Sequence, residues 1–470
     1  MTPPVAAALD RTRISDRTAV HLFTAVHGAD ATPARSTVRR HRRSAREKMA
    51  KEIKAEMTVN VPAVPLIIHW DGKLVEGMAG EGIAERLPIL VSGDGIQKLL
   101  MVPKLAAGTG VLTGQAVYDA AKEWDLVDNI IGMCFDTTVS NTGLKEGACV
   151  HIMKHVKRNL LHFACRHHVL ELVVGAAFTV CFGPSSGPEI QLFKRFVKWW
   201  PLANQASSKP LDDPVDGADK IIATCHALLK EKQPRDDYRE MVQLTIIVLG
   251  GEITLFREEF ALTKHEKREL IRFTTFIVTT YVEPWMSAHC STSAPATDLA
   301  LLKALAAYRD KEIGRASGKV MARHMWYVSE ELVGLSLFDE ATVVEEKRAI
   351  VSALQQRLGE KNPPRRADVA LDAVEQRSLA SFATTNSVGL VTALGAGHDF
   401  LNVDPAEWSG RDDYTTARRR ARHLRVVNDF AERGVALISA FCGAITRDEE
   451  QRQHLLQVVE RHRALYPCAK

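Results

Sequence analysis

The chain has 470 residues, more than one ordinary domain, so we expect several units or one domain with a large insertion. Hydrophobic residues make up 46% and charged residues 25%, which excludes a disordered chain, and a net charge of only +4 excludes general basicity as a sign of nucleic-acid binding. No apolar run is long enough to span a membrane, so the sequence predicts a soluble, intracellular protein without membrane contact. The eight cysteines lack CxxC spacing, and we expect them to be reduced.

Residues 1–58 are predicted to form a basic arm that is helical or partly disordered. Its most basic stretch, RSTVRRHRRSAREKMAKEIK, runs from Arg35 to Lys54. Such a run is either a solvated helix face or a segment that contacts phosphates or directs nuclear import, and the sequence leaves both open. The second interpretation predicts a nuclear location.

Residues 59–178 alternate between strands and helices. Three β-rich runs in close succession predict antiparallel strands, and a helix with one apolar face follows them. The next strand ends abruptly at Asp136. The expected elements are strands 64–74, 86–93 and 98–105, helix 113–126, strand 130–135, helix 143–159 and strand 160–165.

From residue 179 to 412 helical periodicity dominates, which predicts a large all-α insertion. Residues 413–470 are expected to complete the core with two long helices, around 415–443 and 447–465. Within the insertion the sequence predicts helices over 188–200, 218–232, 237–249, 261–285, 296–310 and 323–338.

Two aspartates end predicted strands: Asp71 the first and Asp136 the fourth. This order of elements is the plan of the ribonuclease-H-like fold, in which these two strands lie side by side in parallel. Neighbouring carboxylates repel unless a cation intervenes, and a hard divalent ion such as Mg²⁺ or Mn²⁺ suits oxygen ligands. We expect Thr137, Thr138, Ser140 and Asn141 to cap the next helix and orient Asp136, with a tight turn at Gly143. The alternative is ordinary turn chemistry, which at Asp71 would be a hairpin.

A short motif follows the second aspartate. In LHFACRHHVLELVV (161–174), Cys165 and His168 form a Cys-x-x-His step 29 residues beyond Asp136 (165 − 136). This step resembles the signature after the second catalytic aspartate of hAT-superfamily DNA transposases, whose ribonuclease-H-like core is interrupted by a helical insertion. The third carboxylate of that family lies on a helix after the insertion, and Glu432 in VVNDFAERGVALI (426–438) is similar to it.

The resemblance covers roughly residues 60–467. It extends to a group of hAT-derived animal proteins with runs similar to CFDTTVSNTG, ACRHHVLEL, GPSSGPEIQLFKRF, WYVSEELVGL and VVNDFAERGVALI. It implies a DDE triad of Asp71, Asp136 and Glu432 that holds Mg²⁺ or Mn²⁺ and supports cleavage and transfer of DNA strands. Because Cys165 and His168 make only half a zinc site, we expect them to have a structural role.

Three departures from the transposases leave an alternative open. Residues 428–430 (Asn-Asp-Phe) replace the Ser-rich run before the third carboxylate, so Asp429 rivals Glu432. Residues 72–73 (Gly-Lys) stand where the family continues with Trp-Thr-Ser, and the zinc-finger domain common in the superfamily is missing. The alternative is a domesticated, catalytically inactive scaffold that binds DNA or protein.

A basic cluster precedes Glu432. On a continuous helix Arg425 and Glu432, seven residues apart, would share a face, so these cations would lie beside a carboxylate that holds a metal at a phosphate. The alternative is a solvated face balanced by nearby acids. DNA is therefore the expected partner, and self-association is left open. The cluster consists of Arg418, Arg419, Arg420, Arg422 and Arg425.

Overall fold

The structure is a computed structural model in which the chain forms two units. The first comprises residues 1–165, 393–395 and 416–470, and the second comprises residues 166–392 and 396–415. Of residues 58, 60, 76, 430 and 432 only the backbone is described. The described residues are 1–28, 30, 32–60, 64–76, 82–185, 189–203, 210–233, 235–250, 260–441 and 445–467.

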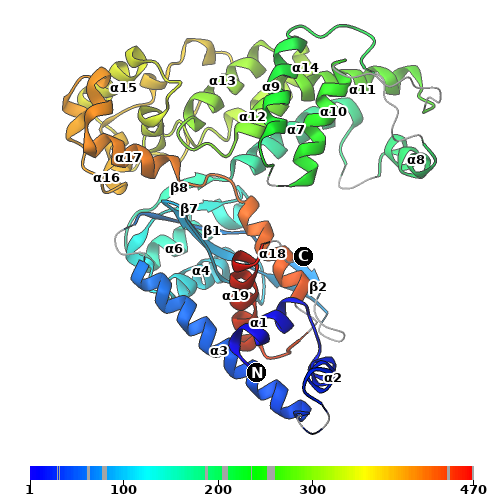
Figure 1. The fold of residues 1–470 in the computed structure, drawn as a ribbon. Helices are drawn as coiled ribbons and strands as arrows, with labels where there is room; N and C mark the ends of the chain where they lie inside the picture. The colour runs from blue at the N-terminus through cyan, green and yellow to red at the C-terminus, as the bar shows by residue number, and fades with distance from the viewer. Residues whose placement is uncertain are drawn as a thin grey trace. The chain divides into compact units, whose positions relative to one another are not determined.

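The first unit is built on a five-stranded mixed sheet (Figure 1). β1 is antiparallel to β4 and β4 to β5, whereas β7 runs parallel to both β1 and β8. The predicted α/β class and the three antiparallel strands in succession are confirmed. In spatial order the strands are β5 (Ile96–Met101), β4 (Ile89–Gly93), β1 (Leu66–Trp70), β7 (Ile130–Phe135) and β8 (Leu161–Ala164).

The predicted single strand 64–74 is wrong, because the chain leaves the five-stranded sheet after Trp70. It continues as β2 (Lys73–Glu76) in a separate three-stranded sheet with β3 (Ile83–Arg86) and β6 (Lys104–Leu105). Aspartate and glycine are poor strand formers, and their place between two apolar runs suits a change of direction. Asp71 therefore lies where the chain passes from one sheet to the other.

Helices α4 (Gly110–Glu123) and α6 (Ala148–Val156) pack against each other beside this sheet. The predicted apolar face of the first is confirmed, because the side chains that form it are at most 3% exposed. The first is three and four residues before the middle two, which are four and three residues before the last, and this spacing puts all of them on one side of the helix. They are Val117, Ala120, Ala121 and Trp124.

The chain returns at its C-terminal end to cover β4 and β5. Helices α18 (Asp429–Phe441) and α19 (Glu449–Leu465) share a buried apolar cluster with Leu90 and Leu99 of these strands. Gln457 donates hydrogen bonds to the carbonyl oxygens of Leu99 and Leu100, at 2.9 and 3.0 Å. An edge strand with unpaired backbone groups is thereby covered by a helix.

The N-terminal segment consists of α1 (Pro3–Arg11), α2 (Asp16–His27) and α3 (Arg35–Asn60), which carries the basic run. Both α1 and α3 pack against α19. The basic run is not solvated throughout, because Arg42 and Arg46 are 1% and 5% exposed. Both guanidinium groups are paired with the fully buried carboxylate of Asp10.

The single helix predicted over 415–443 is wrong. α17 (Asp412–Arg422) ends well before α18 begins at Asp429, and the segment between them is not helical. Four buried side chains lie in this segment: Leu424, Val426, Val427 and Asn428. β-branched residues favour extended backbone, and the Asn428 side chain makes tertiary hydrogen bonds that a continuous helix would not allow.

In the described residues of the second unit there is no strand, as the helical pattern predicts. The helix predicted over 323–338 is wrong in its first half, since only 332–338 is helical and forms a 3₁₀ turn. The helices are α7 (Arg166–Phe182), α8 (Gln191–Trp199), α9 (Ala218–Lys230), α10 (Asp236–Val248), α11 (Lys264–Phe276), α12 (Val282–Ser287), α13 (Ala294–Ala307), α14 (Lys311–Ala322), α15 (Val344–Gln356) and α16 (Val388–Ala393).

Helix α14 has no counterpart among the predicted elements. Two glycines weaken its helical pattern, and both sit at close contacts. A Cβ atom at Gly314 would lie 2.7 Å from the Leu305 carbonyl oxygen, and one at Gly318 would lie 2.8 Å from Leu371. Packing therefore requires glycine where helix propensity disfavours it. None of the helices in the described ranges is both long and apolar enough to cross a membrane.

Candidate functional site

Asp71 and Asp136 follow the last residues of two neighbouring parallel strands, β1 and β7. Within this pair His69 lies opposite Cys134, and the same spacing continued past both strand ends would bring Asp71 level with Asp136. The rings of Trp70 and Phe135, one step earlier, stack with centroids 5.7 Å apart, which agrees with this register. Adjacent strands are about 4.8 Å apart, so both aspartates lie at one edge of the sheet.

The carboxylate of Asp136 is held by the polar residues that follow it. Its Oδ1 accepts hydrogen bonds from the Thr138 backbone N–H at 3.0 Å, the Thr138 hydroxyl at 2.5 Å and the Asn141 amide at 2.7 Å. No residue in the described part of the chain donates to Oδ2. The predicted orientation of Asp136 by Thr138 and Asn141 is confirmed, and Oδ2 is left for a further partner.

Helix capping at this turn differs from the prediction. Thr138 is the N-cap of α5 (Val139–Thr142), but its side chain bonds to Asp136 and makes no capping hydrogen bond. Ser140 bonds to the Thr138 hydroxyl at 3.0 Å, and no hydrogen bond links Thr137 to Asp136 within the described residues. The predicted tight turn at Gly143 is confirmed, since a Cβ atom there would lie 2.9 Å from the Val139 carbonyl oxygen.

Asn141 connects the ends of the two strands. Its Oδ1 accepts a hydrogen bond from the Trp70 indole N–H at 2.8 Å, while its Nδ2 donates to Asp136. Asn141 is 7% exposed, so both bonds are shielded from water. The residue before Asp71 is thereby fixed relative to Asp136.

Asp71 is mostly buried, with a side chain 14% exposed, and its Oδ2 lies 3.2 Å from the Lys73 ammonium group. The hairpin alternative for this turn is wrong, because β1 and β2 belong to different sheets. A cation therefore already accompanies one of the two carboxylates.

Asn428, which the sequence analysis treated only as a departure from the family, joins three parts of the site. Its Nδ2 donates to the Trp70 carbonyl oxygen at 3.1 Å, and its Oδ1 lies 3.1 Å from Nδ1 of the buried His69. Its backbone N–H donates to the Cys165 sulfur at 3.3 Å. Burial lowers the pKa of His69 to about 4, so the ring is neutral and donates from Nδ1 to Asn428. Asparagine is common just before the first residue of a helix, so Asn428 is a sequence signal for a helix that begins at Asp429.

The N-terminus of α18 therefore docks at the carboxyl end of β1. Asp429, the rival third carboxylate, is the first residue of this helix. Burial raises the pKa of the Cys134 thiol, and the negative charge of Asp429 contributes to the same shift. The side chain of Glu432 lies outside the described residues, so the predicted triad stays a prediction. Among the described residues, no group of three or more His, Cys, Asp or Glu side chains could hold a metal ion.

The arginine cluster is divided by the end of α17. Arg425 lies beyond that helix, so the predicted helix face shared with Glu432 is wrong. Arg425 is exposed, and its charge contributes, after burial, to the lowered pKa of His69. Arg419 pairs with Asp94, and Arg420 donates to the Leu394 carbonyl oxygen at 2.6 Å. Arg418 is half-buried and Arg422 exposed.

Cys165 and His168 lie on either side of the boundary between the two units. Cys165 is 4% exposed, and its N–H extends the sheet ladder to the Phe135 carbonyl oxygen at 2.7 Å. His168 is in α7, with a side chain 26% exposed and Nδ1 3.9 Å from Glu171. The expected structural role of this pair stays a prediction.

His324 in the second unit should make stability depend on pH. Burial, together with the charges of Arg366, His168 and Arg323, lowers its pKa from 6.5 to about 4, and the Trp326 indole N–H lies 3.5 Å from its Nδ1. The unfolded chain takes up this proton near pH 6.5 and the folded chain only near 4. Stability is thus complete above pH 6.5 and decreases between pH 6.5 and 4, by about 1–2 kcal/mol for a partly exposed ring. Urea unfolding at pH 7 and 4.5 should show a smaller decrease for His324→Gln than for the wild type, and equal decreases would contradict this assignment.

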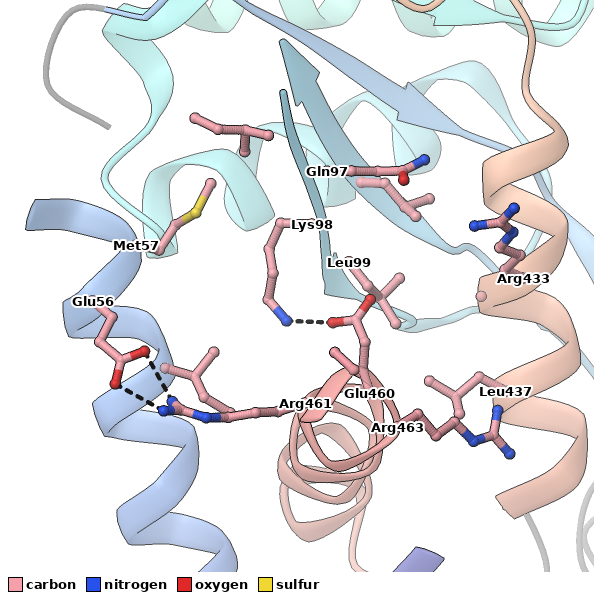
Figure 2. A pocket seen from close by; sticks show the side chains of 15 residues that line it. Glu56, Met57, Gln97, Lys98, Leu99, Arg433, Leu437, Glu460, Arg461 and Arg463 are labelled. Carbon is pink, nitrogen blue, oxygen red and sulfur yellow. Dashed lines mark hydrogen bonds and ion pairs between the residues drawn. The ribbon is translucent and has the colours of Figure 1, made fainter. Parts of the chain in front are cut away.

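A hollow of about 790 Å³ lies elsewhere in the first unit, between α3, β5, α18 and α19 (Figure 2). Lys98 and Glu460 form an ion pair that spans it, and Arg461 binds both carboxylate oxygens of Glu56, at 2.9 and 3.1 Å. Its walls are otherwise mainly apolar. None of the candidate site residues lines this hollow.

Two comparisons with known proteins were negative. No model of a known protein family matches the chain, and no curated protein is similar to it. The resemblance to hAT transposases therefore stays a prediction, and the function must be argued from the geometry of the sheet edge.

Proposed function

We propose that this chain is a hAT-transposase-like protein that cleaves and transfers DNA strands through a DDE carboxylate triad. One observation carries the proposal: Asp71 and Asp136 directly follow the ends of two adjacent parallel strands, and Asn141 ties those ends together. Two carboxylates held at one sheet edge repel each other and favour a shared hard cation.

The topology supports a ribonuclease-H-like core interrupted by an all-α insertion. The first three strands of the larger sheet are antiparallel in succession, and the fourth returns parallel to the first. A long helical segment then separates β8 from α18, whose N-terminus meets the sheet at Trp70. The sequence position of Glu432, one turn into α18, suits the third carboxylate of such a core.

The donor set fits Mg²⁺ or Mn²⁺, which prefer oxygen ligands. Asp71, Asp136 and Glu432 would hold the ions, which when bound activate a water or a DNA 3′-hydroxyl and stabilise the leaving oxygen. Thr138 and Asn141 occupy Oδ1 of Asp136, which leaves Oδ2 as the oxygen that can bind a cation.

DNA phosphates would meet positive charge next to this edge. Arg425 is exposed and lies three residues before Asn428, which bonds to the last residue of β1, and Arg422 is exposed three residues earlier in the chain. Phosphate contacts from such side chains supply sequence-independent affinity for DNA. A nuclear location would follow from this function.

The proposal is tested by nicking of supercoiled plasmid with Mn²⁺. We expect the wild type to nick, and Asp136→Asn to fall to the level of buffer because the carboxylate becomes a neutral amide. Asp128→Asn, an exposed aspartate of the same unit, is the matched control and should nick like the wild type. Nicking that survives in Asp136→Asn would rule out the carboxylate site as its source.

A domesticated binding scaffold is the second candidate, and the Lys73–Asp71 ion pair favours it. An ammonium group 3.2 Å from Oδ2 neutralises a carboxylate that a metal would otherwise use. A folded protein that neither nicks DNA nor binds Mn²⁺ by electron paramagnetic resonance, yet loses DNA affinity in Arg422→Gln/Arg425→Gln, would identify the scaffold. Lys122→Gln/Lys154→Gln is the control for that loss of charge.

A further inference from the structure

The basic run of α3 lines a small hollow in the first unit, next to the N-terminal helices. Its volume is about 100 Å³. Three molecules of liquid water occupy about the same volume, and so does one phosphate group. It lies between α2, α3 and the start of α19, which are the dark blue, blue and red helices of Figure 1. The lining residues are Asp16, Arg39, Arg42, Arg43, Arg46, Ile445, Thr446, Arg447, Asp448 and Gln451.

Four of the five arginines come from one face of one helix. Arg39, Arg42, Arg43 and Arg46 are three, four and seven residues apart, the spacing that brings side chains together on a helix. Arg42 is held in place by Asp10, Asp16 and the Ile14 carbonyl oxygen. The hollow is thus partly walled by guanidinium groups whose positions are fixed by the fold.

Three of the arginines that line the hollow keep N–H groups that are not used in hydrogen bonds to described residues. Arg46 uses Nε and Nη2 on Asp10, and its Nη1 donates to no residue in the described ranges. Arg39 and Arg447 are exposed, and neither is bonded to any residue that the structure describes. Each of the three can turn N–H groups toward the hollow.

Gln451 is the second and independent sign of a ligand. It is 4% exposed, and its Oε1 is buried with no hydrogen-bond partner among the described residues. Leaving a buried polar atom unsatisfied costs about 1–3 kcal/mol, so such an atom at a cavity wall indicates a missing partner. A half-turn of the amide exchanges oxygen and nitrogen and presents N–H donors to the hollow.

The acids near the hollow do not cancel its charge. Asp10 is shared by Arg42 and Arg46, Asp16 accepts from Arg42 at 2.8 Å, and Asp448 lies 3.3 Å from Arg43. Five arginines against three aspartates leave a net charge of +2 (5 − 3). The N-terminus of α19 adds no net positive charge, because Asp448 caps it and its first turn carries Glu449 and Glu450. Glu449 is itself paired with Arg86 and Arg452.

From these observations we propose that the hollow binds one phosphate group, taken either from a nucleic-acid backbone or from free phosphate. Arg39, Arg46, Arg447 and Gln451 supply its hydrogen bonds. Guanidinium groups match phosphate oxygens in geometry as well as charge. The site shares no residue with the sheet edge of Asp71 and Asp136, so it stands whether or not the chain cleaves DNA.

The test compares two double variants of the full chain with the same change of charge. Arg39→Gln/Arg447→Gln removes exposed donors from the hollow, and Arg35→Gln/Arg40→Gln removes exposed arginines of α3 that do not line it. Inorganic phosphate binding is measured by calorimetry, and binding to a 20-base-pair duplex by fluorescence anisotropy over a salt series. Thermal unfolding without phosphate should be equal for the two variants.

We expect phosphate affinity to fall at least about tenfold in the hollow variant and to be unchanged in the control. If the phosphate belongs to nucleic acid, the salt dependence of duplex binding also decreases by about one charge in the hollow variant alone. If duplex binding is the same in both, the ligand is free phosphate. Equal behaviour of the two variants toward both probes would overturn the proposal.

Gln451→Leu separates a built site from diffuse positive charge. It keeps the net charge and the approximate volume, and it removes the unsatisfied amide. Phosphate affinity should fall while stability without phosphate is not reduced. Unchanged phosphate affinity in this variant would show that the amide does not face the ligand and would remove Gln451 from the site.

Discussion

Asp10→Ala should lower the free energy of unfolding by about 3–5 kcal/mol, because it leaves two buried cations without their shared counter-ion. Asp10 is fully buried and accepts four hydrogen bonds, at 2.5–3.0 Å, from Arg42 and Arg46. Both guanidinium groups are almost fully buried, and the small hollow that they line holds only a few waters, so neither regains full solvation unless α3 moves away from α1. The loss of one carboxylate thus acts on two charges.

Urea unfolding at pH 7 measures this effect, with two matched variants for comparison. Asp16 is 19% exposed and bonds to Arg42 only, so Asp16→Ala should cost less than Asp10→Ala. Asp128→Ala, at an exposed aspartate of the same unit, should change stability by no more than about 0.5 kcal/mol. A cost below about 1 kcal/mol for Asp10→Ala would mean that the arginines reach water, and that α1 and α3 do not pack as described.

The charge run of α3 shows where sequence reasoning stops. Its arginines predict a helical surface that faces solvent. This prediction fails at two of the six arginines of α3, Arg42 and Arg46, because both bond to Asp10, which lies 32 residues before Arg42 in the chain. Local patterns carry no information about such a distant partner. A buried carboxylate opposite the run is a tertiary feature, as is the hollow that the remaining arginines line.

The sequence predicts the strand ends that carry Asp71 and Asp136 better than it predicts the bounds of the helices around them. Apolar runs bounded by Asp71 and Asp136 mark both strand ends, and a parallel pairing of these strands then brings the aspartates together. The break between α17 and α18 could not be found in this way, because residues 423–428 (His-Leu-Arg-Val-Val-Asn) contain neither proline nor glycine to mark it. Their extended backbone is stabilised by burial and by the bonds of Asn428, neither of which has a local sequence pattern.

Asn428→Ala is the second large effect that we expect, a loss of about 2–4 kcal/mol in the free energy of unfolding. The variant leaves two buried groups unsatisfied, the Trp70 carbonyl oxygen and Nδ1 of His69, and each costs about 1–3 kcal/mol. Asn428→Asp should also destabilise, because a carboxylate cannot donate to the Trp70 carbonyl oxygen. Asn159→Ala, at an exposed asparagine of the same unit, should be neutral within about 0.5 kcal/mol.

The same substitution separates a positioning role of Asn428 from a purely structural one. Asn428 fixes the start of α18 at the residue before Asp71, so its loss should free the helix that carries Asp429 and Glu432 from the sheet edge. Native-state hydrogen exchange should then show faster exchange in the first turns of α18 than in α19, whose contacts with β5 are unchanged. Equal acceleration in both helices would mean that Asn428 stabilises the unit as a whole and does not fix the position of α18 relative to Asp71.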